Sequence, residues 1–363
     1  MEVMEIFSDI PDPRVERTRD HKLIDIVMIT LAAVICGSKS WYDIEEFGHV
    51  RHDWLKGFPE LPEGIPSHDT FNRFFSAIDN RILEERFVRW VSSISEKRTG
   101  VVAIDGKCLK SSRKKGSKSF TTMVGAWSQA NGLCIAQVKT ADKSNEIKAI
   151  PELLDLLFLE GCTVTIDAAG CQTAIAEKIR EKGADYVLVV KGNQGSLKEG
   201  IEDTMRLSEA SDVHEYTDFG HGRIEIRKCR VYGDLTHLNN PVTWKGLKSL
   251  AVIEAERIEK STGVSTNETR LYISSLEADA AIISKAVREH WGIENRLHWS
   301  LDVTFGEDGD KKRAGNANVN FSIVNRIVLN ILKSDPKKRS LAGKKLNATW
   351  DVTYLEKLLK LRI

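Results

Sequence analysis

The chain has 363 residues, 41% of them are hydrophobic, and its formal net charge is +1. This length and apolar content predict two or three domains with cores of their own. The near-zero net charge excludes a global positive field of the kind that marks many DNA-binding proteins, so contacts with a polyanion have to come from local basic patches.

The six cysteines are scattered along the chain and form no C-x-x-C pair. This spacing excludes a zinc site of that kind and a disulfide framework, and it predicts a reducing compartment. The N-terminus lacks a signal-peptide layout, and the apolar stretch 24–37 is too short to span a bilayer. We therefore expect a cytoplasmic protein, associated with the nucleoid when it binds DNA, that has no membrane partner.

Residues 1–98 predict a helical domain. The apolar segment 21–36 ends at Gly37, which is a typical residue for the end of a helix. A Pro- and Gly-rich connector then leads to Ser67, which is suited to cap a helix over 68–78.

The helix over 68–78 is a candidate recognition helix. It is short and follows a tight connector, as in helix-turn-helix proteins, where Asn72 and Arg73 would read base edges. The alternative is an ordinary bundle helix whose phenylalanine side chains form core. We therefore predict that 1–98 binds DNA, with the simple bundle kept as the competing interpretation.

From Val101 the pattern changes to short apolar strands alternating with helices. Three strands in a meander, with a hairpin turn at Asn131-Gly132, precede strand–helix crossovers, which predicts a mixed α/β sheet with helices on both faces. The order matches the ribonuclease H-like fold, in which the first and fourth strands are neighbours. The expected elements are strands over 101–106, 119–130, 132–140, 162–168 and 184–192, with helices over 146–159 and 172–183.

The second half of the chain returns to alternating, β-rich sequence before helical periodicity resumes at Ala280. We interpret 191–276 as a β-rich subdomain inserted into the core. The predicted catalytic core then comprises 99–190 and 277–335, and 336–363 is expected to be a basic C-terminal tail.

Three acidic residues are candidates for chemistry. Asp105 and Asp167 each end an apolar strand and are followed by small residues, and Glu294 lies far downstream in the aromatic-rich segment HWGIENRLHW. Carboxylates at the ends of buried strands, with one on a helix, are suited to hold hard divalent cations for phosphoryl transfer. The alternative for each aspartate is a side chain that caps a turn.

Two histidines share a helical stripe with the downstream acid. His290, Glu294 and His298 recur every four residues, which leaves a zinc site as an alternative. Zinc hydrolases place their histidines four residues apart, whereas His290 and His298 are eight residues apart. We therefore favour Glu294 as the third carboxylate, with the histidines contacting phosphate or orienting neighbours. The acids Asp302, Glu307, Asp308 and Asp310 then tune the site, bind metal or form a charged loop, and we favour the loop.

A basic run follows Asp105 directly. Its cations are candidates to hold the phosphates of the cut strand, and the alternative is a solvated loop. Asn193 and Gln194, after the last of the buried strands, are weaker candidates to contact DNA or position the site. The candidate DNA-binding residues of the run are Lys107, Lys110, Arg113, Lys114 and Lys115.

In its motifs the chain resembles the DDE transposases of bacterial insertion sequences, specifically the H-repeat-associated group. The matching segments run in order along nearly the whole chain, and the one around Glu294 is highly specific. They are GIPSHDTFNRFF, VVAIDGKCLK, KSNEI, TIDAAGCQ, VVKGNQ, HGRIEIR, HWGIENRLHWSLDVTFGED and GKKLNATW.

The resemblance implies a ribonuclease H-like core, a helical N-terminal domain and a metal-bound triad of Asp105, Asp167 and Glu294. It also implies Mg²⁺, with Mn²⁺ as a substitute and two ions per site, and double-stranded DNA as the partner for strand cleavage and strand transfer. A homodimer or higher multimer on DNA is expected, because enzymes of this mechanism pair two ends.

One departure limits the resemblance. Related insertion-sequence transposases place Tyr, Arg and Lys around the glutamate, where this chain has Val287, His290 and Leu301. His290 is a candidate for the phosphate contact, and the lysine has no counterpart in this segment. Two other functions stay open: a DNA-binding protein that has lost transposition, and a ribonuclease H-like nuclease without a joining step.

Overall fold

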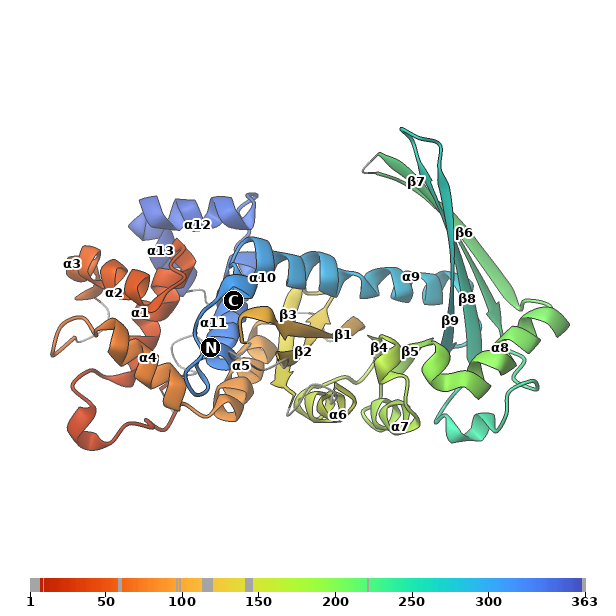
Figure 1. The fold of residues 1–363 in the computed structure, drawn as a ribbon, viewed down its shortest axis with the longest axis horizontal. Helices are drawn as coiled ribbons and strands as arrows, with labels where there is room; N and C mark the ends of the chain where they lie inside the picture. Colours follow the sequence, from red (N-terminus) through yellow and green to blue (C-terminus); the bar gives the residue numbers. More distant parts are fainter. Residues whose placement is uncertain are drawn as a thin grey trace.

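The computed structural model describes residues 7–8, 10–57, 61–95, 97, 99–112, 120–140, 146–220 and 222–360. Its centre is a nine-stranded mixed sheet in the order β3-β2-β1-β4-β5-β9-β8-β7-β6, with helices on both faces (Figure 1). The sheet begins with β1 (Gly100–Leu109), β2 (Thr121–Ser128), β3 (Leu133–Lys139), β4 (Cys162–Ile166) and β5 (Asp185–Val190).

The predicted neighbourhood of the first and fourth strands is confirmed. β1 runs antiparallel to β2 and parallel to β4, and β4 runs parallel to β5. The helices α6 (Glu146–Leu156) and α7 (Thr173–Glu181) connect these strands and cover one face of the sheet. The expected ribonuclease H-like order is therefore present in the first five strands.

The β-rich segment expected as an insertion extends the same sheet. It contributes β6 (Asp212–Gly220), β7 (Arg223–Tyr232), β8 (Ser249–Glu259) and β9 (Ser265–Ser274), preceded by α8 (Gly195–Leu207). β9 pairs antiparallel with β5, so the segment continues the ladder that the core leaves open at β5. The far ends of these strands curve away from the sheet as a projecting arm (Figure 1).

The N-terminal region is helical, as predicted, and it packs against the C-terminal helices (Figure 1). Ser40, Ser67 and Asp79 each accept a hydrogen bond from the first turn of the helix that follows, and Gly37 ends the first long helix with a φ of 112°. The helices are α1 (Leu23–Cys36), α2 (Trp41–Val50), α3 (His52–Leu55), α4 (His68–Ala77) and α5 (Asn80–Ile94).

The segment 336–363, expected as a basic tail, instead forms two helices in its described part. Ser340 caps α12 (Leu341–Trp350) and Asp351 caps α13 (Val352–Leu359), and apolar side chains of both helices join the core around α1. Lys344 is buried and donates to the Leu332 and Asp335 carbonyls. Backbone acceptors thus compensate the charge of this lysine, which belongs to the expected basic tail.

Three further helices connect the arm to the C-terminal part of the chain. They are α9 (Ala280–His290), α10 (Trp299–Val303) and α11 (Ala317–Ser334), with the π-helix η7 (Ile293–His298) between the first two. α9 crosses the face of the sheet opposite α6 and α7 (Figure 1). Single 3₁₀ turns are η2 (Glu16–Thr18), η3 (Lys110–Ser112), η4 (Ala168–Gly170), η5 (Gly192–Gln194), η6 (Pro241–Thr243) and η8 (Glu307–Gly309).

In the described residues, no single helix has the length and apolar character needed to cross a membrane. One bent pair, α1 with α2 at 96°, meets those criteria by length and composition alone.

Asn330 of α11 pairs with the backbone of β3, the strand at one edge of the sheet. Its side-chain amide donates to the Cys134 carbonyl at 2.7 Å and accepts from the Cys134 N–H at 3.0 Å, and both residues are fully buried. Asn330→Leu leaves both backbone groups unpaired, so we expect the free energy of unfolding to fall by about 3 kcal/mol. Denaturant unfolding measures this loss.

The matched control is Asn267→Leu on the exposed part of β9, which should change stability by about 0.5 kcal/mol or less. Equal stability of the Asn330→Leu protein and the control would contradict the edge-closing role.

Candidate active site

Asp105 and Asp167 come together because β1 and β4 are in parallel register. The last residue pair of that ladder joins Ile104 to Ile166, so the next residue of each strand is an aspartate at the same edge. Asp105 Oδ1 accepts from the Gly106 N–H at 2.8 Å, and Asp167 Oδ1 accepts from the Ala169 N–H at 3.1 Å. Local backbone groups thus hold both carboxylates.

Glu294 reaches the same place from the helical side. α9 lies across β1, β4 and β5 and leads into η7, whose second residue is Glu294. A π-helix has wider turns than an α-helix and is frequent at functional sites.

The three predicted carboxylates line one cavity of about 190 Å³, which we call the acid cavity. Its walls come from the ends of β1, β4 and β5, from β9 and from α9, so distant parts of the chain build it. Two cations, Lys191 and Arg270, also line it. The other lining residues are Thr165, Ile166, Ala168, Val187, Val189, Tyr272, Val287, His290 and Trp291.

The surroundings in the acid cavity disfavour the ionised form of Asp105. Burial raises the pKa of Asp105 to about 7, and repulsion by Asp167, Glu294 and Glu146 adds to this effect, against the Gly106 N–H. Such repulsion between carboxylates is relieved by a bound cation or by a proton.

Glu146, at the start of α6, is a fourth acid that the strand-end pattern did not reveal. A Cβ added to Gly106 would lie 2.4 Å from its Oε1, so its carboxylate lies directly over the backbone next to Asp105. Burial and the nearby Asp167 raise the pKa of Glu146. The available sequence signal was the matching motif KSNEI, in which Glu146 is the acid.

The raised pKa of Asp105 makes the ion-free protein less stable as pH rises. The carboxyl is protonated up to about pH 7 when folded and only up to about pH 3.9 when unfolded. Stability is therefore lost between those values, by ~2–4 kcal/mol after allowance for screening of a side chain that is 20% exposed.

Asp105→Asn removes this titration. In chelator-treated protein, we expect the variant to be the more stable by that amount at pH 8 and to lose the advantage at pH 4. Thermal unfolding across this range measures the difference, and a difference that does not vary with pH would contradict the assigned cause.

Both histidines of the stripe favour the uncharged form. Burial lowers the pKa of His290 to about 4 and that of His298 to about 3. His290 Nδ1 lies 2.9 Å from Thr165 Oγ1, and His298 Nδ1 lies 3.7 Å from Asp105 Oδ2. The structure thus places one histidine beside β4 and the other beside Asp105.

The donor set suits an oxygen-preferring cation, because carboxylates of three residues share one cavity. Within the described part of the chain, no three His, Cys, Asp or Glu side chains are grouped as a ready metal site, which also leaves the zinc alternative without support there. The fit to a hard divalent cation therefore rests on donor chemistry and on the mutual repulsion of the acids.

The lysines after Asp105 are paired with downstream acids. Lys107 is buried, and its Nζ lies 2.5 Å from Asp302 Oδ1 and 3.4 Å from Asp308 Oδ1. The exposed Lys110 also pairs with Asp308. These contacts give Asp302 and Asp308 a structural role as partners of the basic segment. Three further predicted DNA-binding residues, Arg113, Lys114 and Lys115, lie outside the described residues.

Glu307, expected in a charged loop, is buried instead. Its carboxylate accepts from the Arg326 guanidinium at 2.8 Å and from the Ser322 hydroxyl at 2.9 Å, and both charged side chains are at most 3% exposed. It therefore attaches the segment after α10 to α11.

The predicted recognition helix, α4, buries its phenylalanines at 71, 74 and 75 in the N-terminal core, as its competing interpretation required. Arg73 is exposed, whereas Asn72 is half-buried and accepts from the Ser76 hydroxyl. Asn193 and Gln194 donate to the Ala168 and Cys171 carbonyls and so hold the turn after Asp167.

Two family models match this chain. The one described as "Transposase DDE domain" matches residues 96–331, and the one described as "DDE_Tnp_1-associated" matches residues 4–91. Together they span the helical N-terminal region and the sheet with its acid cavity.

Curated relatives match over nearly full length. "Putative transposase YncI" of Escherichia coli O157:H7 is 40% identical, over 98% of this chain and 94% of that protein. "H repeat-associated putative transposase YhhI" of Escherichia coli strain K12 is 41% identical, over 98% and 97%. A solved piggyBac transposase synaptic complex with hairpin DNA aligns at 12% identity and a TM-score of 0.46, over 99% of this chain and 81% of that one.

Proposed function

This chain belongs to the DDE transposase family, and from that premise we propose that it is a DNA transposase that cuts the ends of an insertion sequence and joins them to target DNA. The observation that carries the proposal is the meeting of Asp105, Asp167 and Glu294 at one cavity. We propose double-stranded DNA as its substrate and the cytoplasm as the compartment in which it works.

Asp105, Asp167 and Glu294 are the residues that would hold divalent cations, Mg²⁺ or its substitute Mn²⁺, with two ions per site. Bound there, such ions supply activation of a water or of a DNA 3′-hydroxyl and stabilise the leaving oxygen of an in-line displacement. The family supports a dependence on divalent metal in general, and the choice of ion and the number per site belong to this proposal.

The protein's own groups would orient and neutralise the substrate. Lys191 and Arg270 line the acid cavity, where their positive charges would contact the oxygens of the phosphate that is cut. His298 beside Asp105 is a positioning residue, because its imidazole is buried and uncharged next to the carboxylate. The apolar side chains of Val187 and Val189 line the same space.

Joining of a cut end to a second DNA molecule distinguishes transposition from simple cleavage. The experiment incubates the protein with a labelled duplex carrying the element ends, a supercoiled plasmid and Mn²⁺ or Mg²⁺. We expect nicked and plasmid-joined products, both lost in Asp167→Asn and retained in Asp155→Asn, an exposed acid of α6 that pairs with Lys178.

Cleavage without joining would replace the proposal with a nuclease, and binding without cleavage would replace it with a DNA-binding relic. We also propose a homodimer or higher multimer on DNA, because two ends have to be paired. A single subunit holding both paired ends, measured from the mass of the complex in solution, would refute that part.

A further inference from the structure

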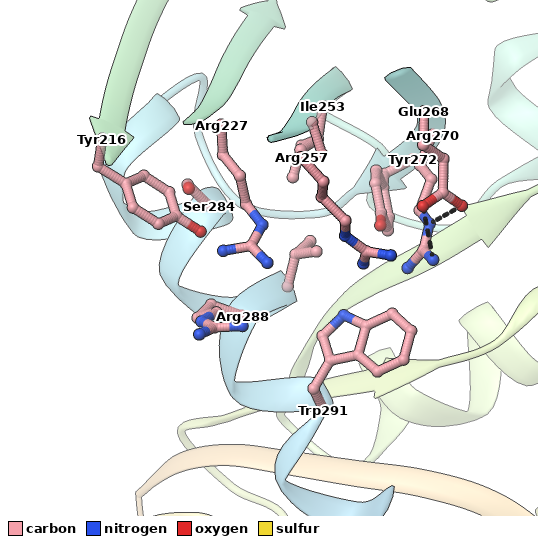
Figure 2. Close-up of a pocket in the computed structure, with 12 residues that line it drawn as sticks. Tyr216, Arg227, Ile253, Arg257, Glu268, Arg270, Tyr272, Ser284, Arg288 and Trp291 are labelled. Carbon is pink, nitrogen blue, oxygen red and sulfur yellow. Dashed lines mark hydrogen bonds and ion pairs between the residues drawn. The ribbon is translucent and has the colours of Figure 1, made fainter. Parts of the chain in front are cut away.

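The inner face of the projecting arm carries a cluster of arginines. Because side chains alternate along a strand, every second residue of β7, β8 and β9 points toward α9. Those positions include Arg227, Arg257 and Arg270, and α9 adds Arg288 from the opposite side. Figure 2 shows their guanidinium groups directed into one space above Trp291. We call this space the arginine cleft.

Carboxylates hold the arginines in place. Asp218 pairs with Arg227 at 3.0 Å and with Arg288 at 3.1 Å, and the buried Glu225 pairs with Arg227 and lies 3.6 Å from Arg257. At the mouth of the cleft, Arg257 and Arg288 keep 43% and 48% of their side chains exposed. Fixed guanidiniums with exposed donors form a preorganised anion site.

The arginine cleft and the acid cavity share a wall. Arg270, Tyr272, Val287 and Trp291 line both spaces, and the Arg270 guanidinium stacks over the Trp291 ring at 4.6 Å from its centroid. An extended anion that leaves the acid cavity on this side therefore meets the arginines next.

The cations nearest to the acid cavity indicate that DNA leaves it toward the arginine cleft. An anionic substrate at a cluster of carboxylates needs compensating positive charge nearby. Lys107 and Lys110, the described lysines of the basic run, are already paired with Asp302 and Asp308. Within the described residues that line the acid cavity, the cations are the exposed Lys191, which follows β5, and Arg270 of β9, which also pairs with Glu268.

We propose that the arginine cleft binds the phosphate backbone of the DNA strand that continues from the acid cavity. This inference rests on the proposed function, because it assigns the path of the same substrate. The guanidiniums leave only about 30 Å³ of free space between them, too little for a base. The strand would therefore lie across the mouth, with Arg257 and Arg288 contacting successive phosphates.

The test is DNA binding in chelator, where no cutting occurs. Fluorescence anisotropy measures the affinity for a labelled duplex across a salt series. The double variant Arg257→Gln, Arg288→Gln should lose about a hundredfold in affinity, about tenfold per charged contact. The slope of log affinity against log salt should become shallower by about 2, because each phosphate contact contributes about 0.9.

The matched control is Arg206→Gln on α8, an exposed arginine that pairs with Asp203 and lies on the other face of the sheet. It should retain the affinity and the slope of the unmodified protein. If the double variant loses its folded state in a thermal melt, the single variant Arg257→Gln replaces it and should lose about tenfold in affinity and about 0.9 in slope.

Unchanged affinity and slope in the double variant, or in Arg257→Gln where it replaces that variant, would overturn the inference. A full arginine effect without any cleavage in metal would keep the cleft and reject the transposase function. Cleavage that depends on Asp167, without any effect of the arginine substitutions on DNA binding, would keep the proposed catalytic site and reject the arginine cleft. Absence of DNA binding by the unmodified protein would overturn both.

Discussion

Glu294→Gln is expected to lower the rate of DNA cleavage by about a thousandfold or more while leaving the fold intact. The side chain is exposed at the acid cavity, so the nearly isosteric amide disturbs little packing. It removes one anionic ligand of the proposed metal site, whose stabilisation of the transition state amounts to several kcal/mol. A loss of ~4 kcal/mol corresponds to about three powers of ten in rate.

The rate is measured on an end-labelled duplex with saturating Mn²⁺. Glu289→Gln is the control, since Glu289 lies on the preceding helix, pairs with Lys285 and does not line the acid cavity. It should cut within about twofold of the unmodified protein. If Glu294→Gln retained a tenth of the normal rate, Glu294 would not be a member of the site.

Arg326→Met is expected to have the largest effect on stability. The change leaves Glu307 buried with an uncompensated charge, and breaking a buried ion pair from one side costs about 3–5 kcal/mol. Denaturant unfolding at pH 7 should show this loss.

The exposed pair Lys248–Glu277 provides the comparison for Arg326→Met. Lys248→Met should cost less than about 1 kcal/mol, because solvent screens an exposed pair. A loss below about 1 kcal/mol in Arg326→Met would show that Glu307 is protonated or finds water in the folded protein, contrary to the assigned ion pair.

The sequence was sufficient to predict the meeting of the two aspartates. Each ends an apolar run, and the order of strands and helices makes the two runs neighbours in a parallel ladder. The structure confirms the neighbours and the register that puts Ile104 opposite Ile166. Local patterns were sufficient for this prediction because short segments of sequence determine both where each strand ends and the order of strands and helices.

The buried charges were beyond the same reasoning. Charged residues are normally solvated, so the sequence pattern predicts a charged loop around Glu307 and an accessible basic run, available to DNA phosphates, around Lys107. Their partners lie 19 and 195 residues away, and only the folded chain brings them together. One signal was available: Arg326 interrupts the apolar helix FSIVNRIVLNILK, and a buried arginine requires an anion.

Glu146 and the arginine cleft were missed for a different reason. Glu146 follows no apolar run, so the rule that located the aspartates does not apply to it. The alternating pattern of the β-rich segment predicts strands, and it does not single out the arginines of β7, β8 and β9. Their common orientation depends on how the arm curves over α9, which no local pattern specifies.

The measurement that tests the central claim most directly is metal-dependent nicking of a duplex carrying the element ends, by the unmodified protein and by Asp167→Asn. The account predicts nicks with Mg²⁺ or Mn²⁺, no nicks in chelator, and no nicks by the variant under any condition, with equal DNA binding by both proteins. Nicking by Asp167→Asn at the unmodified rate would contradict it, because the acid cavity would then not be where DNA is cut.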